Sequence, residues 1–131
     1  MKKDRTENRD KNGNLILCGA NAYEKKYFFN HDFDRIPESI QEDLHIVCVL
    51  FTEEVGGIFT IGFDSEGQVV LSTDAEEDDI YYDEVSSGLL IGEIRRNREE
   101  LFEQLELYYR LAVKGENPEA LLKELADAEE A

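Results

Sequence analysis

Tryptophan is absent from this chain of 131 residues, methionine occurs once, and proline and cysteine occur twice each. Two cysteines are too few for the disulfide framework that stabilises small secreted domains. No apolar run approaches the roughly 18 residues that a membrane-spanning helix needs. Because the sequence also lacks a secretion signal, we expect a cytoplasmic protein with reduced thiols that does not enter a membrane.

Basic residues are scarce in the middle of the chain. The formal net charge is −17. Residues 1–26 carry +3, residues 27–94 carry −16 and residues 95–131 carry −4. A field of this sign repels phosphate backbones and anionic lipids. The charge therefore excludes direct binding of nucleic acid or membrane, and it favours a basic protein or a divalent cation as partner.

The apolar segments lie between two charged ends. Residues 1–14 contain no apolar side chain after Met1 and are predicted to form a disordered basic arm. Residues 15–115 contain the amphipathic and apolar segments, which suffice for one domain with one core. Residues 116–131 are predicted to form a C-terminal helical tail, because Pro118 is followed by leucines at helical spacing.

Residues 93–114 are predicted to form one long amphipathic helix, the main helix of the core. Its apolar positions recur every three or four residues and are Ile94, Leu101, Phe102, Leu105, Tyr108, Tyr109 and Ala112. Acidic and basic side chains occupy the opposite face, as is typical of a helix that packs on a core. A shorter helix over residues 80–90 is predicted to lead into it.

Residues 37–55 are predicted to form a second helix, which begins near Pro37 and ends before Gly56. The apolar positions that fit helical spacing are Ile40, Leu44, Val47, Cys48, Phe51 and Val55. The alternative is a buried strand over residues 45–52, because this segment is rich in good strand formers. We favour the helix because the helical spacing extends well beyond that segment.

Residues 58–73 are predicted to form a β-hairpin. Phe59, Ile61 and Phe63 alternate with smaller or polar residues, and Gly67 closes the turn. Residues 15–20 form a short apolar segment, and residues 21–29 fit either a short helical turn or the start of an extended segment. We therefore expect a single small α+β domain in which a hairpin, with a third strand as an option, packs against two main amphipathic helices.

Residues 74–84 hold seven acidic residues around the apolar segment Ile80, Tyr81 and Tyr82. Like charges at this density are expected to raise the pKa values of the carboxyl groups. The run starts like a calcium-binding loop, but Asp79 occupies the position that requires glycine. We therefore predict a solvated acidic loop before the following helix.

Two cysteines and two histidines are candidate metal ligands. His45 and Cys48 lie one helical turn apart, Cys18 could join them, and His31 could be a fourth ligand. Thiolate and imidazole ligands would suit zinc. Against this, Cys48 lies on the apolar face of the predicted helix, which favours a buried and inert thiol. We identify no catalytic or cofactor-binding residue and expect no cofactor.

Aromatic side chains and the acids near them form a candidate interaction surface. Its residues are Tyr23, Tyr27, Asp78, Asp79, Tyr81 and Tyr82. Proteins that bind single-stranded nucleic acid combine such aromatics with a positively charged groove. Because this chain is strongly negative, we expect the surface to bind another protein, which its charge suggests is basic. Spare aromatic surface would also suit a homodimer.

Four segments carry a resemblance to a known family. They are NAYEKKYFFN, CVLFTEEVGGIFTIGFDSEG, YYDEVSSGLL and ELFEQLELYYRL. Together they resemble an uncharacterised bacterial family of small acidic proteins with a domain of unknown function, over the region from Cys18 to Gly115. The resemblance implies no activity, cofactor or catalytic residue.

Three functions are compatible with these features. The first is a non-enzymatic cytoplasmic module that binds another protein. The second is an acidic mimic of nucleic acid that occupies the basic groove of a DNA-handling protein. The third is a small metal-binding protein or enzyme that uses Cys18, His45 and Cys48. We favour the first, because the acidic and aromatic residues are the most distinctive feature of the sequence.

Overall fold

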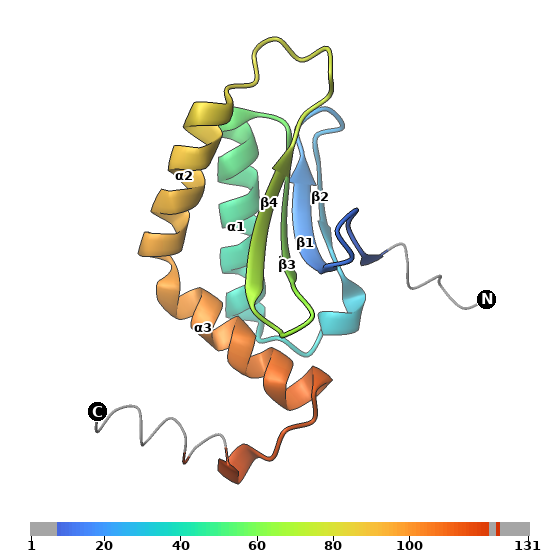
Figure 1. The fold of residues 1–131 in the computed structure, drawn as a ribbon, viewed down its shortest axis with the longest axis vertical. Coiled ribbons are helices and arrows are strands. Elements are labelled where there is room, and N and C mark those ends of the chain that lie inside the picture. Colours follow the sequence, from blue (N-terminus) through green and yellow to red (C-terminus); the bar gives the residue numbers. More distant parts are fainter. Residues whose placement is uncertain (1–7, 121–122, 124–131) are drawn as a thin grey trace, which may run out of the picture.

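The computed structural model describes residues 8–120 and 123, and its strands form one antiparallel sheet. The strands are β1 (Leu15–Asn21), β2 (Lys26–Phe29), β3 (Ile58–Phe63) and β4 (Val69–Asp74). Their order in the sheet is β2-β1-β3-β4, so β2 and β4 are the two edge strands (Figure 1). β1 pairs with both β2 and β3, and its register with β3 shifts between Ile16 and Cys18.

Three helices pack on the sheet or on one another. α1 (Glu38–Val55) packs on β1 and β3, and α2 (Glu84–Asn97) packs against α1 on the same side of the sheet (Figure 1). α3 (Glu99–Tyr108) crosses beneath the turn between β3 and β4 and continues into a π-helical turn, η3 (Tyr109–Val113). Among the described elements, α1 contacts three of the strands and α3 contacts β4.

The hydrophobic core lies between α1 and the sheet. The rings of Phe51 on α1 and Phe59 on β3 stack with centroids 4.3 Å apart, and both side chains are fully buried. At the end of β3, the rings of Phe63 and Tyr109 lie 4.8 Å apart, which joins the sheet to η3. Fully burying side chains of this size contributes about 1.5–3 kcal/mol each.

Most of the predicted architecture is confirmed. The chain forms a single α+β domain, and residues 37–55 form a helix rather than a strand, because α1 spans Glu38–Val55. The hairpin of β3 and β4 is also present, with Ile58 paired to Asp74 and Phe63 paired to Val69. Residues 15–29, for which the sequence predicts an apolar segment followed by an undecided one, add a second hairpin, so the sheet has four strands.

The prediction of one continuous helix over residues 93–114 is wrong. The helical segment divides at Arg98, whose φ of −120° and ψ of 26° are not helical. The first part packs on α1, whereas the second turns under the sheet to bury Leu101, Phe102 and Leu105. Helical spacing continues through the break, so periodicity alone does not reveal it. The shorter helix begins at Glu84 rather than Ile80 and forms the first part of α2.

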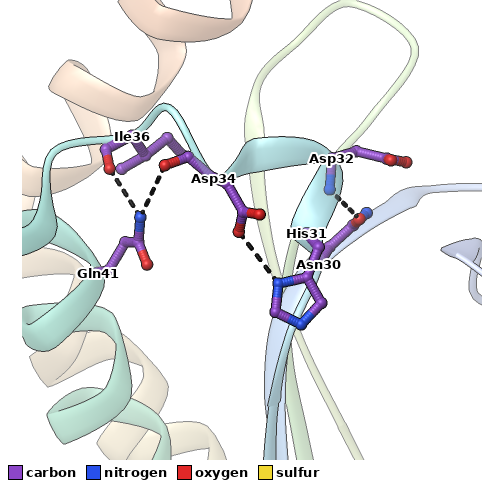
Figure 2. A network of polar contacts seen from close by, with 6 residues as sticks. All are labelled: Asn30, His31, Asp32, Asp34, Ile36 and Gln41. Carbon is purple, nitrogen blue, oxygen red and sulfur yellow. Dashed lines mark hydrogen bonds and ion pairs between the residues drawn. The ribbon is translucent and has the colours of Figure 1, made fainter.

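Polar contacts fix the connection between β2 and α1 (Figure 2). The Asn30 side chain accepts a hydrogen bond from the Asp32 backbone N–H at 3.0 Å, which begins the short 3₁₀ turn η2 (His31–Phe33). Gln41 on α1 donates from Nε2 to the carbonyl oxygen of Ile36 at 2.7 Å. These bonds set the position at which α1 begins relative to β2.

The charged ends lie partly outside the described residues. Within the predicted basic arm, the Asp10 carboxylate accepts hydrogen bonds from the backbone N–H groups of Asn12 and Asn14, at 2.8 and 2.9 Å. Within the predicted tail, residues 118–120 are helical. Residues 1–7, 121–122 and 124–131 are not described, so a disordered arm and a helical tail stay predictions there.

Candidate functional site

The acidic loop between β4 and α2 is tied to the turn between β1 and β2. The Tyr23 hydroxyl donates to Asp79 Oδ2 at 2.6 Å and accepts from the Glu76 backbone N–H at 3.1 Å. Asn21 in turn fixes the position of Tyr23, because its Oδ1 accepts from the Tyr23 N–H at 2.9 Å. Both segments lie at the same end of the molecule, beyond the sheet (Figure 1).

The end of the loop is fixed by the start of α2. Asp83 caps this helix, accepting hydrogen bonds from the backbone N–H groups of Val85 at 2.9 Å and Ser86 at 3.3 Å. The Ser86 hydroxyl donates to the same carboxylate at 2.8 Å. Such an acid at a helix N-terminus satisfies backbone donors that otherwise lack partners.

The expectation that crowding raises the carboxyl pKa values in this loop is wrong for two of its residues. The hydrogen bond from Tyr23 lowers the pKa of Asp79 below its ordinary range, and backbone N–H groups contribute further. Hydrogen bonds from the Ser86 side chain and backbone likewise lower the pKa of Asp83. Specific donors to the ionised form outweigh the repulsion between neighbouring acids at these two positions.

Tyr82 has a structural role, because it connects the end of the acidic loop to β4 and α2. Its hydroxyl contacts the Thr73 hydroxyl on β4 and donates to Ser87 Oγ on α2 at 2.8 Å. Ser87 is buried, so these bonds join α2 to the sheet where a polar group would otherwise lack a partner. Tyr82 was predicted as an interaction residue, but its hydroxyl is already occupied within the fold.

Four apolar side chains project into solvent from the acidic loop and α2. Ile80, Tyr81, Val85 and Leu89 are 84%, 90%, 71% and 69% exposed. The acids Glu76, Glu77, Asp78 and Glu84, which are close to them in the sequence, are also exposed. We call these eight residues the acidic–apolar surface. Exposed apolar residues that group together are typical of sites that bind a partner.

Only part of this surface is predicted from the sequence. Tyr81 and Asp78 belong to it, but Ile80, Val85 and Leu89 were not selected. Val85 and Leu89 stand four residues apart, which is equally the spacing of a buried helical face. The α2 residues that do face the rest of the fold include Ser87 and Ile91.

Tyr27, another of the predicted interaction residues, lies on β2 and packs against α1. Its ring stacks on that of His45, with centroids 4.0 Å apart and planes 14° apart. The Tyr27 hydroxyl is buried and has no nitrogen or oxygen partner in the described part of the chain; the Cys18 thiol beside it is only a weak hydrogen-bonding group. Burial is the main cause that raises the pKa of Tyr27, followed by the nearby thiols of Cys18 and Cys48.

The structure brings the two cysteines together in the core. Cys18 Sγ on β1 and Cys48 Sγ on α1 lie 3.8 Å apart, and both thiols are free and fully buried. The hydrogen bond with Cys18 and burial raise the pKa of Cys48 well above its ordinary range. A raised pKa disfavours the thiolate, which is the form that binds metals and acts as a nucleophile.

The candidate metal ligands do not form a metal site in this part of the structure. His45 stacks on Tyr27, whereas His31 is exposed and its Nδ1 lies 3.1 Å from Asp34 Oδ1 (Figure 2). Over residues 8–120 and 123, no group of three or more histidine, cysteine, aspartate or glutamate side chains could hold a metal ion.

The comparisons with known proteins identify a family but no characterised relative. Among the described residues, no helix is long and apolar enough to cross a bilayer. No curated protein and no solved structure matches the chain. A family of unknown function, DUF6145, matches residues 14–117, which include all four strands and the helices α1 to α3. The chain therefore belongs to DUF6145, a family of unknown function.

Proposed function

We propose that the chain is a non-enzymatic module that binds a basic protein through the acidic–apolar surface. The observation that supports this proposal is the exposure of Ile80, Tyr81, Val85 and Leu89 among acids in one short stretch of the chain. A partner with apolar side chains framed by lysine or arginine would bury these groups and complement the negative charge.

The rigidity of the surface also supports this role. Tyr23 holds the acidic loop through Asp79, and Asp83 holds the start of α2. A loop fixed before binding loses less conformational entropy when a partner docks. Tyr81 and Ile80 project from a segment that is already ordered, which is the arrangement expected of binding residues on a fixed scaffold.

An acidic mimic of nucleic acid is the second candidate. Glu76, Glu77, Asp78 and Glu84 are exposed and supply the required charge. The two candidates differ in the contribution of apolar contacts. Binding through charge alone weakens steeply as salt rises, whereas apolar contacts persist. The exposed apolar residues among the acids favour the first candidate.

The test is affinity capture from lysate of the source organism, washed at low and at physiological salt. The full chain is compared with the variant Tyr81→Ala/Val85→Ala. Removing two central apolar side chains from an interface costs about 1–4 kcal/mol, so the variant should retain little of the partner. The matched control is Val113→Ala, which truncates an exposed valine on η3.

Three outcomes separate the candidates. A partner that is retained at both salt concentrations, and lost only from the double variant, supports the protein-binding module. A DNA-handling protein that is released at physiological salt supports the mimic. A partner that is captured equally by all three chains places the interface elsewhere and contradicts the assignment of the surface.

A further inference from the structure

The edge strand β2 presents unpaired backbone groups. The Asn30 backbone N–H donates to the Leu17 carbonyl oxygen at 2.8 Å, and Phe28 pairs with Gly19. Hydrogen-bonding directions alternate along a strand, so the N–H and C=O groups of Tyr27 and Phe29 point away from β1. No described residue forms a hydrogen bond with them. This edge can therefore accept another strand.

The opposite edge of the sheet is closed where β4 begins. Glu106 Oε2 on α3 accepts from the Val69 backbone N–H at 2.9 Å, and Arg95 Nη2 on α2 donates to the Val69 carbonyl oxygen at 3.4 Å. These two side chains thus form hydrogen bonds with the outward-pointing N–H and C=O groups of Val69. Within the described residues, the outward-pointing groups of Val69 on β4 therefore have partners, whereas those of Tyr27 and Phe29 on β2 do not.

Hollows lie on both sides of β2. On the side of α1, a hollow of about 510 Å³ is lined by residues that include Tyr27, His45 and Val49. On the other side, a hollow of about 540 Å³ is lined by residues that include Ile16 and Phe28. Side chains of a strand point alternately to its two faces. A strand added to β2 would therefore direct its side chains into the two hollows in turn.

Two lysines stand at the start of β2, next to a turn that also carries Glu24 and contacts the acidic loop. Lys25 and Lys26 are exposed at the start of β2, and neither forms an ion pair in the described part of the chain. β2 itself contains no acid. Lys25 and Lys26 line the hollow beside α1 together with Glu53, so an incoming carboxylate is expected on the lysine side of that hollow, away from Glu53.

We propose that β2 and α1 form a groove that binds an extended segment of a partner protein as a fifth strand of the sheet. The segment carries apolar side chains at alternate positions, which fill the two hollows. It carries an acidic residue or a terminal carboxylate beside Lys25 and Lys26. Backbone pairing with Tyr27 and Phe29 supplies affinity, and the hollows and lysines supply specificity. This site is separate from the acidic–apolar surface and does not depend on it.

The test begins with a displayed library of random decapeptides, which is selected against the purified full chain. The most enriched peptide is synthesised and labelled with fluorescein, and its affinity is measured by fluorescence polarisation. Amide hydrogen exchange, followed by NMR, then locates its binding site. At a peptide concentration about 100 times the Kd, exchange at the Tyr27 and Phe29 amides should slow about 100-fold, because these amides exchange only from the free chain.

Charge reversal tests the position of the acidic end. Lys26→Glu should weaken binding of the selected peptide about tenfold or more, because an attractive contact becomes repulsive. Arg96→Glu, which makes the same change of charge on an exposed residue of α2, should leave the affinity nearly unchanged. Both side chains are exposed, so both variants are expected to fold, which thermal melting verifies.

Several results would overturn the proposal. These are a library that enriches no peptide or only basic peptides, equal effects of the two charge reversals, and unchanged exchange at Tyr27 and Phe29. Protection of these amides by raised protein concentration alone would assign the edge to a second copy of the chain, and would likewise overturn the proposal. Failure at β2 leaves the acidic–apolar surface untouched, because its test uses different variants.

Discussion

The hydroxyl group of Tyr23 donates a hydrogen bond to Asp79 Oδ2 at 2.6 Å and thereby joins two turns that lie far apart in the sequence. The bond favours the ionised carboxylate, which lowers the pKa of Asp79. It also raises the pKa of Tyr23, because the hydroxyl proton is held by the carboxylate. This one hydrogen bond therefore holds the acidic loop in position and also shifts the pKa values of Asp79 and Tyr23.

Replacing Tyr23 with phenylalanine should release this loop. The pKa of Asp79 should rise toward its ordinary value of 3.8, because the donor with the largest effect is removed. The folded pKa of Asp79 is lowered, so its stabilising contribution is complete above pH 4 and disappears as pH falls through the folded pKa. The folded pKa of Tyr23 is raised, so its contribution is complete below pH 10 and disappears as pH rises further.

The stability difference between the parent chain and Tyr23→Phe should therefore be largest near neutral pH. Carboxyl titration by NMR measures the pKa of Asp79, and urea unfolding at several pH values measures the stability difference. Tyr81→Phe is the matched control, because that side chain is 90% exposed. An unchanged pKa of Asp79 in Tyr23→Phe would show that the hydrogen bond is not formed in solution.

A side chain at Gly67 is predicted to destabilise the fold. It closes the turn between β3 and β4 with a φ of +84°, and a Cβ atom there would lie 2.3 Å from the Tyr109 ring. Gly13 has a φ of +82° but open space around its Cβ position. Alanine at either site should cost about 1–2 kcal/mol, because L-residues disfavour positive φ.

The difference between these two glycine variants isolates the packing of the turn against η3. Gly67→Ala should cost a further 1–3 kcal/mol or so, because the buried Tyr109 ring must move. Thermal or urea unfolding of Gly67→Ala and Gly13→Ala provides the comparison. Equal destabilisation by the two changes would mean that Tyr109 does not pack on the turn.

The extent to which sequence predicts this fold depends on how each element is stabilised. The periodicity of α1 predicts its bounds because one face of the helix, including Leu44, Cys48 and Phe51, is buried along most of its length. The hairpin of β3 and β4 is predicted because alternation and a glycine turn agree. The break at Arg98 is not, because it depends on the direction in which α3 must turn to reach the core.

The candidate site is predicted less completely for a similar reason. The acids and tyrosines are visible in the sequence, but the roles of the tyrosines depend on distant partners. Tyr82 donates a hydrogen bond to Ser87, and the Tyr27 ring stacks on that of His45, whereas the Tyr81 side chain is exposed to solvent. No local pattern separates these three environments. The exposed Leu89 is missed because its spacing also fits a buried face.

The two buried thiols should be unreactive while the chain is folded. Cys18 and Cys48 have no exposed surface, and the raised pKa of Cys48 keeps its thiol protonated. Reaction with a disulfide reagent such as DTNB at pH 8 should therefore proceed only as fast as the chain opens. The chain unfolded in urea should release two equivalents rapidly, which serves as the control. Rapid reaction without urea would show that β1 separates readily from α1.

Replacing Tyr27 with phenylalanine is predicted to stabilise the fold, whereas removing the hydroxyl of a well hydrogen-bonded buried tyrosine would destabilise it. The buried hydroxyl of Tyr27 has no nitrogen or oxygen partner among the described residues and only the weakly bonding Cys18 thiol beside it, so the fold bears most of the cost of removing it from water. Tyr27→Phe keeps the stacking on His45 and removes that cost. The variant should be more stable than the parent chain by about 1 kcal/mol in urea unfolding near neutral pH. Tyr81→Phe, whose hydroxyl is in solvent, should change nothing.

Tyr27→Phe should also reduce the loss of stability that the chain undergoes at alkaline pH. Burial raises the pKa of Tyr27 above its ordinary value of 10.0. Its neutral form is favoured in the fold, so the corresponding contribution to stability is complete below pH 10 and is lost as pH rises further. The parent chain should lose stability above pH 10 more steeply than Tyr27→Phe. A destabilised Tyr27→Phe variant would instead show that the hydroxyl has a partner in solution, for which an ordered water is the natural candidate.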